Sequence, residues 1–418
     1  MPAPRVIFSA GDHALVRAWA GDLLERMRRH GGGPDGSVTR LVYTPEWCGA
    51  MAELEDWMTV AGLEVRVDAV GSRFGRLAGS LADTVLTGSH VDTVPRGGAF
   101  DGAMGIAVAA CAVRWLREMV GRPRLTLEVL ANCEEESSRF ATGFWGSRAM
   151  LGLIRPDEPD WIRDASGVSI GQAMWACGLD PALIPTARRS DLVAFIEPHV
   201  EQGPELEQAG LPIGVVERIV GVRQLRITMD GVAGHAGTLP MADRRDALAG
   251  AAEVVLAVEA AAREAGPPAV ATVGVLEVEP GGFNQVPGRA RFSVDLRHDD
   301  PEALAALEER IRRAVDRIAA GRGLAVALER PFAQAPVDMD PRLVETIERV
   351  CREAGIPWRR MPSHAGHDAQ VLAGACPVAM IFSPSRGGLS HRPDEHTDLD
   401  DVARAVRVLV GTLQQIAY

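Results

Sequence analysis

Histidine and acidic residues that follow strand-like runs are the clearest sign of chemistry in this chain. His90 and Asp101 stand at the two ends of the glycine-bearing stretch HVDTVPRGGAFD. Other candidates follow further apolar runs, namely Glu134, Glu135, Glu136, His199 and His391. Imidazole nitrogens and carboxylate oxygens are the ligands that zinc and manganese take in proteins. The set therefore predicts a site for two divalent metal ions and a hydrolytic reaction.

The surroundings of Asp101 favour a bridging role. Glycines on both sides let the backbone turn tightly, and a carboxylate held in such a turn can bridge two cations. The alternative is an aspartate that caps a helix starting near Ala103. Asp92, two residues after His90, is placed to accept the second ring N–H of that histidine and so to fix its tautomer.

Three consecutive glutamates would ordinarily form a solvated charged run. Here they follow the apolar run 125–130, so at least one of them must point into a site or find a buried partner. Neighbouring glutamates can divide the work of a metal site, because one binds the metal while the other stays free as a general base for water.

Further along the chain lie three residues that could contact a substrate. His235 lies among small residues in GVAGHAG, where it is either a turn histidine or a donor to the oxyanion of a tetrahedral intermediate. Asn284 and Arg297 could clamp a substrate carboxylate, since the arginine fork suits that group. Both could equally be ordinary polar residues at strand ends.

The remaining histidines divide into two sets. His364 and His367, in SHAGHDA, compete with His391 for the last metal position. The others have no supporting context and are expected at the surface, namely His13, His30, His298 and His396.

The elements that must position these residues alternate between helix and strand. Apolar periodicity predicts helices over residues 13–32, 50–61 and 104–116, and strands over 84–87, 125–130, 192–197 and 378–382. This order predicts an α/β catalytic domain with an open, mixed or largely parallel sheet flanked by helices. In such sheets the functional groups gather beyond the carboxyl ends of the strands.

The middle of the chain follows another pattern. It predicts strands over 225–230, 271–278, 290–296 and 324–328 and helices over 243–265 and 301–320, which together make a four-stranded, two-layer α+β unit. Since metal candidates lie both before and after it, we expect an insertion at 214–331 into a catalytic domain formed by 1–213 and 332–418.

Composition narrows the class of protein. A chain of 418 residues exceeds what one core normally serves, so two domains are expected. The net charge of −12 argues against nucleic acid as a partner. Six scattered cysteines predict no disulfide framework and fit the cytoplasm. Neither a signal peptide nor an apolar run of membrane-spanning length is evident, so no membrane partner is expected.

The motifs together resemble the dinuclear metal amidohydrolases that include aminoacylase-like peptidases, N-carbamoyl-L-amino-acid hydrolases and allantoate amidohydrolases. The blocks that carry the resemblance are GSHVDTVPRGGAFDG, EEESSRF, HVEQGPELE, GHAGTLPMADRRDA, NQVPG, DLRH, HAGHDAQ and GGLSHRPDE. The resemblance implies two Mn²⁺ or Zn²⁺ ions per subunit, held by His90, Asp101, Glu136, His199 and His391. It also implies that Glu135 is the general base. The substrate contacts that it implies are Gln202, His235, Asn284 and Arg297, and the inserted domain would serve as a lid and homodimer interface.

Within this hydantoinase/carbamoylase branch, blocks such as FWGSR at Phe144–Arg148 are most similar to bacterial allantoate amidohydrolase. Two residues depart from the family pattern, because Ser137 and His364 stand where it has glycine. The resemblance implies hydrolysis of allantoate to ureidoglycine, ammonia and carbon dioxide. An N-carbamoyl-L-amino-acid hydrolase is the alternative, in which case the substrate is another small ureido or carbamoyl compound with a carboxylate. A non-catalytic, metal-dependent binding protein ranks lower.

Overall fold

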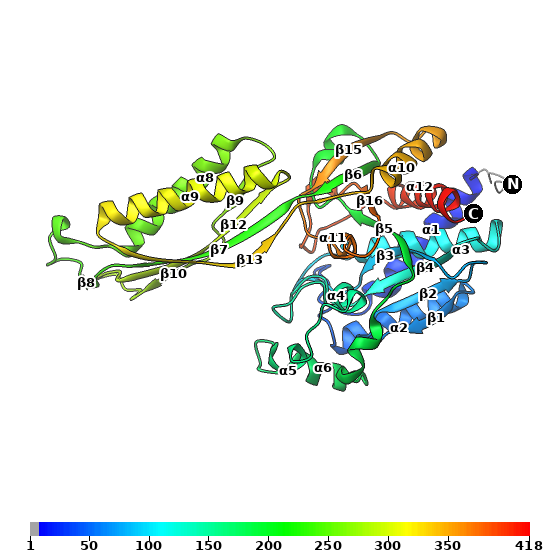
Figure 1. The fold of residues 1–418 in the computed structure, drawn as a ribbon, viewed down its shortest axis with the longest axis horizontal. Coiled ribbons are helices and arrows are strands. Elements are labelled where there is room, and N and C mark those ends of the chain that lie inside the picture. Colours follow the sequence, from blue (N-terminus) through cyan, green and yellow to red (C-terminus); the bar gives the residue numbers. More distant parts are fainter. Residues whose placement is uncertain (1–7) are drawn as a thin grey trace. The chain divides into compact units, whose positions relative to one another are not determined.

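The computed structural model describes residues 8–418 and divides the chain into two compact units (Figure 1). The first unit combines the chain up to Glu217 with Met339–Tyr418, and the second is Arg218–Asp338. The second unit thus interrupts the first in sequence, with bounds a few residues later than the 214–331 expected.

A mixed sheet of nine strands organises the first unit, in the order β1-β2-β4-β3-β5-β16-β6-β14, with β15 also paired to β6. Its edge strand β14 and the last two residues of β6 fall within the residue range of the second unit. The strands are β1 (Glu64–Val67), β2 (Arg73–Leu77), β3 (Thr84–His90), β4 (Thr126–Asn132), β5 (Leu192–Val200), β6 (Ile213–Ile219), β14 (Val337–Asp338), β15 (Trp358–Ser363) and β16 (Val378–Ser383). The neighbours β4, β3, β5 and β16 run parallel, and β2 and β6 flank them antiparallel. The predicted mixed sheet is confirmed.

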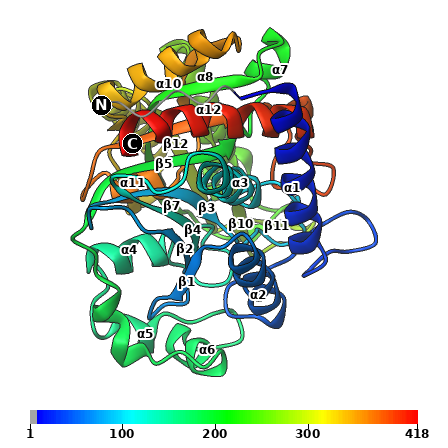
Figure 2. The ribbon, with the colours of Figure 1, turned by 90° about the vertical axis from the view of Figure 1, so that its right-hand side faces the viewer.

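Helices flank this sheet (Figure 2). They are α1 (Ala10–Arg28), α2 (Pro45–Val60), α3 (Ala103–Met119), α4 (Trp145–Leu151), α5 (Glu158–Trp161), α6 (Ile170–Ala176), α7 (Glu205–Ala209), α10 (Pro341–Ala354), α11 (Asp368–Leu372) and α12 (Leu399–Ala417), with short 3₁₀ turns η1 (Pro181–Ala187) and η3 (Arg386–Gly388). Helix α3 packs against β3, β4 and β5 and also against α1 and α12. Because it is enclosed on several sides, its first eleven residues are all buried, which explains its alanine-rich sequence.

Capping residues place two helix starts earlier than apolar periodicity predicted. Ser9 Oγ accepts the Asp12 N–H at 3.2 Å, and the Asp12 carboxylate accepts the Ser9 N–H at 2.7 Å, so α1 begins at Ala10 rather than at residue 13. It also ends at Arg28 rather than at residue 32. Thr44 caps α2, which therefore begins at Pro45 rather than at residue 50.

The second unit packs two helices on an antiparallel sheet ordered β10-β12-β7-β13, with β9 also paired to β12. Its elements are β7 (Gly221–Asp230), β8 (Gly234–His235), η2 (Met241–Asp243), α8 (Ala247–Ala265), β9 (Val270–Thr272), β10 (Leu276–Glu279), β11 (Gln285–Val286), β12 (Arg289–His298), α9 (Pro301–Arg322) and β13 (Ala325–Gln334). The predicted strand 271–278 is wrong as a single element. It is broken between Thr272 and Leu276, and each half pairs with a different part of β12, so this sheet has five strands rather than four.

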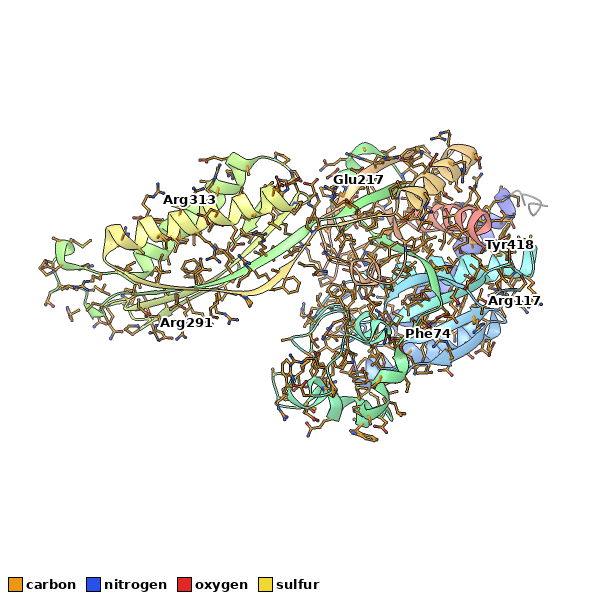
Figure 3. All side chains as sticks on the ribbon, viewed as in Figure 1. Phe74, Arg117, Glu217, Arg291, Arg313 and Tyr418 are labelled. Atoms are coloured by element: carbon orange, nitrogen blue, oxygen red, sulfur yellow. The ribbon has the colours of Figure 1, made fainter. Side chains whose placement is uncertain are left out.

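Alternating side chains build the core of this second unit. Leu225, Ile227 and Met229 of β7 lie in one buried cluster with Ile311 and Val315 of α9. The exposed Arg313 lies on the opposite side of that helix (Figure 3). This amphipathic pattern is the one expected for a two-layer α+β unit.

The six cysteines are free thiols, although Cys48 Sγ lies 3.1 Å from Cys177 Sγ. Within residues 8–418, no helix combines the length and apolar character that crossing a membrane requires.

Candidate metal centre

The candidate ligands come from four adjacent parallel strands of the first unit. His90 is the last residue of β3, His199 lies one residue before the end of β5, and Glu135 and Glu136 follow β4. His391 lies in the loop after β16. Because parallel neighbours end at the same edge of a sheet, these side chains meet beyond that edge.

His90, Asp101 and His199 form a first group of candidate ligands, all of them buried. The Nε2 atoms of the two histidines are 3.5 Å apart. Asp101 Oδ1 lies 3.2 Å from His199 Nε2 and 3.7 Å from His90 Nε2. Three potential ligand atoms therefore converge on one small volume.

Hydrogen bonds to main-chain carbonyls orient the two imidazoles. His90 Nδ1 lies 3.0 Å from the Asp92 carbonyl oxygen, and His199 Nδ1 lies 2.9 Å from the Val200 carbonyl oxygen. A carbonyl can only accept, so Nδ1 carries a proton in both rings and Nε2 of a neutral ring has a free lone pair. This is the tautomer that a metal ion requires at Nε2.

Asp101, Glu136 and His391 form a second group. His391 Nε2 lies 3.2 Å from Asp101 Oδ2 and 3.4 Å from Glu136 Oε1. Hydrogen bonds to these two carboxylates raise the pKa of His391 to about 10, against the opposing effect of its burial. The site therefore strongly favours positive charge at this position.

Asp101 belongs to both groups, one oxygen facing each. Burial alone would raise its pKa, but hydrogen bonds with His199, His391 and His90 outweigh burial and hold the pKa well below its ordinary value. The capping alternative is not found, because Gly102 is the N-cap of α3 and the helix has no side-chain cap. Gly102 has a φ of 63°, and a Cβ there would lie 2.5 Å from the His90 ring, so glycine is required next to Asp101.

The glutamates are buried rather than solvated. Glu134 is fully buried, and the side chains of Glu135 and Glu136 are only 10% and 7% exposed. Glu135 Oε2 lies 4.0 Å from His90 Nε2. Burial, followed by repulsion from Glu136, raises the pKa of Glu135 well above its ordinary value, although His90 opposes this. A raised carboxyl pKa suits a group that takes up and returns a proton.

Asp92 acts differently from the expectation. Its main-chain carbonyl receives the His90 N–H, while the carboxylate is 3.6 Å from that nitrogen. The carboxylate instead accepts the N–H groups of Glu135 and Glu136 at 3.1 and 3.0 Å. Asp92 therefore holds the glutamate loop in place, and Ser137 continues that loop with a φ of 56°. A positive φ explains why glycine is the usual residue there.

The arrangement fits two divalent cations. The Nε2 atoms of His90 and His199 lie 3.7 and 3.2 Å from the same oxygen of Asp101, and the side chains of Glu135 and Glu136 are buried close by. Several buried carboxylates in one small volume are costly unless positive charge balances them. His90 and His199 would hold one ion, Glu136 and His391 the other, and Asp101 would bridge them.

His391, rather than His364 or His367, completes the second group. His367 is buried, its ring lies 4.5 Å from the His199 ring and its Nε2 is 2.8 Å from Ser363 Oγ. It belongs with Glu197 and His199 to a separate set of possible ligands. His364 is exposed, in the turn that follows β15.

Gln202 lies at the second group. Its Nε2 donates to Asp101 Oδ2 at 2.9 Å and lies 3.5 Å from His391 Nε2. The φ angles of Gln202 and His391 are 60° and 58°, a left-handed conformation that costs free energy for residues other than glycine. Such strain is typical of positions that a site constrains.

The other predicted substrate contacts belong to the second unit. His235 and Asn284 are exposed neighbours, since β8 pairs with β11 and the Ala236 N–H donates to the Asn284 carbonyl at 2.9 Å. Arg297 lies near the far end of β12, where its Nε donates to Asp295 Oδ1 at 2.8 Å.

The histidines expected at the surface are half-buried, because each packs against a neighbour. His13 and His30 face Asp400 and Glu53, at 3.5 and 3.7 Å. His298 lies beside Asp299, and His396 packs edge-on against Phe100.

Sequence reasoning missed Glu395 and Ser390. Glu395 is buried and accepts the Asp101 N–H at 2.8 Å, while Ser390 Oγ lies 2.9 Å from Asp101 Oδ2. Both lie inside the block GGLSHRPDE, so their closeness to His391 in sequence was the available signal.

Comparison with known proteins gives a consistent family. The family model described as Peptidase family M20/M25/M40 matches residues 86–415. The chain is 40% identical to an allantoate amidohydrolase of Escherichia coli (strain K12) over 93% of this chain and 95% of that protein. It is 42% identical to an N-carbamoyl-L-amino-acid amidohydrolase of Paenarthrobacter aurescens over 91% of this chain and 93% of that protein. A solved amidase of the hydantoinase/carbamoylase family from Burkholderia multivorans superposes with a TM-score of 0.88 at 36% identity, covering 96% of this chain and 98% of that one.

Proposed function

The chain belongs to the Peptidase family M20/M25/M40, and from this premise we propose that it hydrolyses a ureido C–N bond. The substrate that we propose is allantoate, which with one water gives ureidoglycine, ammonia and carbon dioxide. The observation that carries the proposal is Glu135, a buried carboxylate 4.0 Å from His90 and beside both ligand groups.

Two divalent ions, Mn²⁺ or Zn²⁺, would supply Lewis acidity and make a water molecule acidic near neutral pH. His90, Asp101, Glu136, His199 and His391 would hold these ions.

Glu135 performs the proton transfers in this proposal. Its raised pKa lets it accept a proton from the attacking water and return that proton to the departing nitrogen. Gln202, whose amide donates to Asp101 Oδ2, presents its side chain beside the second group. His235 would donate a hydrogen bond to the oxyanion, and Asn284 and Arg297 would bind the substrate carboxylate.

The positions of these last three residues within the second unit support a homodimer. Asn284 lies five residues before β12 begins at Arg289, and His235 is close to it because β8 pairs with β11. Arg297 lies eight positions further along β12 than Arg289. At 3.3 Å per residue, the two ends are about 25 Å apart. A small substrate cannot contact both ends in one copy, so we propose that a second copy supplies one of them. Exposed apolar side chains of this unit offer a surface for pairing, among them Met241, Leu256 and Phe283.

An N-carbamoyl-L-amino-acid hydrolase is the second candidate, favoured by the 42% identity to the Paenarthrobacter aurescens protein. Both substrates carry a carboxylate and a ureido carbonyl, so the metal centre serves either. A pocket that pairs the second ureido arm of allantoate would leave polar groups unpaired with a carbamoyl amino acid, at about 1–3 kcal/mol each.

The experiment compares kcat/KM for allantoate, N-carbamoyl-L-alanine and N-carbamoyl-L-methionine under identical Mn²⁺ loading. We expect allantoate to lead by at least about tenfold, the factor that about 1.4 kcal/mol provides. The reverse order would move the assignment to the carbamoyl amino acids. Inactivity on all three would direct attention to His364, one of the two departures from the family pattern.

A further inference from the structure

Glu395 joins two of the loops that carry the second ligand group, the loop of Asp101 and the loop of His391. Its Oε1 accepts the N–H groups of Phe100 and Asp101 at 2.9 and 2.8 Å. Its Oε2 accepts the His391 N–H at 3.3 Å and lies 3.0 Å from Ser390 Oγ. One carboxylate therefore contacts the backbone at both the bridging residue and the last ligand.

The surroundings of Glu395 are shaped for this carboxylate. The residue is 5% exposed, and a Cβ at Gly98 would lie 2.4 Å from its carboxyl group. The loop before Asp101 can therefore approach Glu395 this closely only because residue 98 is glycine. Ser390 Oγ lies between the Glu395 and Asp101 carboxylates, 2.9 Å from Asp101 Oδ2. Backbone N–H groups, the Ser390 hydroxyl and close packing against Gly98 therefore all hold the Glu395 carboxylate in place.

His391 needs such a contact because its backbone is strained. Its φ of 58° lies in the left-handed region, which a non-glycine residue keeps only when surrounding contacts hold it there. The hydrogen bond from His391 N–H to Glu395 is such a contact. Without it, the loop would relax and carry the imidazole away from Asp101 and Glu136.

We infer that Glu395 is a positioning residue that holds Asp101 and His391 in one cation site and thereby sets the affinity of the second group for its metal ion. The inference rests on the proposed two-metal function. His90 and His199 have their own carbonyl partners at Asp92 and Val200, so the first group does not depend on Glu395 for those two ligands.

The test titrates Mn²⁺ alone into the metal-free full-length chain by calorimetry. The wild type should show two binding events. Glu395→Gln keeps the size of the side chain but replaces one accepting oxygen by an amide N–H₂, so it cannot accept from both loops. It should weaken one event by about 10–100-fold, the usual effect of removing a partner that orients metal ligands. The other event should weaken less, because only Asp101 is shared and His90 and His199 keep their own carbonyl partners.

Two further variants keep the test decisive. Glu158→Gln alters another buried glutamate that accepts a backbone N–H, and it should leave both events unchanged. Glu395→Asp keeps the charge but shortens the side chain, so it should weaken the same Mn²⁺ binding event. This variant serves as the test if Glu395→Gln does not fold. Equal weakening of both events, or no weakening, would overturn the inference. A wild type that binds only one ion would instead overturn the two-metal proposal, and this inference with it.

Discussion

At the scale of single residues, the candidate site places buried carboxyl groups and histidines close together, and their environments shift the pKa values of the carboxyl groups in opposite directions. The Asp101 carboxylate has a depressed pKa, whereas burial raises the pKa of Glu135 well above its ordinary value. Two carboxyl groups of one site that differ in this way can serve as a fixed ligand and a proton carrier respectively. We therefore expect the chemistry of Glu135 to be separable from metal binding.

We predict that Glu135→Gln keeps both metal ions but lowers kcat by at least about 10²–10⁴-fold, the usual contribution of a general acid or base. Glutamine fills the same volume but cannot take the proton from water. The measurement pairs metal analysis with steady-state kinetics. Near-normal turnover at unchanged metal content would show that another residue is the base.

The sequence predicted the candidate ligands but not the residues that hold them in place. His90, His199 and His391 were predictable because each follows a strand-like run and imidazole has few other reasons to recur there. Glu395 was not, since its partner Asp101 lies 294 positions away and is bound through the backbone N–H, whose position no side-chain pattern reveals. Likewise, Asp92 was expected to orient His90 through its carboxylate, but the fold turns that carboxylate to the glutamate loop.

At the scale of elements, four parallel strands account for the meeting of ligands from distant positions, and this arrangement was predictable from alternating helices and strands. The sequence did not predict the break near residue 274 in the second unit, because the residues on both sides of it are apolar as in one continuous strand. The break results from the pairing of the two halves with different parts of β12, and a local sequence pattern carries no information on that pairing.

A buried charge cluster ties the elements of the second unit together. Glu308 on α9 is 2% exposed and accepts hydrogen bonds from Arg223 of β7, Arg312 of α9 and Arg330 of β13. Burial alone would raise the pKa of Glu308, but these three arginines outweigh it and hold the pKa below its ordinary value. A depressed carboxyl pKa contributes stability above the unfolded pKa, and that contribution is lost as the pH falls through the folded value.

We therefore predict that Glu308→Gln lowers the free energy of unfolding of the chain by about 2–3 kcal/mol at pH 7. This loss is smaller than the loss on breaking a fully buried ion pair, because the arginines are partly exposed. The loss should shrink as the pH falls from about 4, the range of an unfolded glutamate, through the lower pKa of folded Glu308, where the wild-type carboxylate becomes protonated. Thermal unfolding at a series of pH values measures this. Glu309→Gln is the control, since Glu309 is exposed on the same helix beside Arg313. A stability gap that stays constant with pH would contradict the charge argument.

At the scale of the whole molecule, the proposal requires two copies of the chain. The separation of about 25 Å between the two ends of β12 is the physical reason, because it exceeds the size of any small ureido acid. The sequence predicted an inserted unit and its use in pairing, but it could not predict which residues act across the pair.

Mixing two inactive variants tests this arrangement. Glu135→Gln chains retain His235, and His235→Ala chains retain Glu135. If His235 acts on the partner's site, each mixed dimer has one complete site out of two. Random mixing makes half of the dimers mixed, so the rate should recover to about a quarter of the wild type for C₂ pairs. No recovery in verified mixed dimers would place His235 in the same chain as its site.

The central claim is that two divalent ions in this centre are needed for ureido hydrolysis, and the most direct measurement is activity against metal content. Metal-free full-length protein is loaded with increasing Mn²⁺, and bound ions per chain and ammonia release from allantoate are recorded on the same samples. The account predicts that metal content saturates at two ions per chain and that activity requires loading. Full activity of the metal-free chain, or saturation of both quantities at one ion per chain, would contradict it.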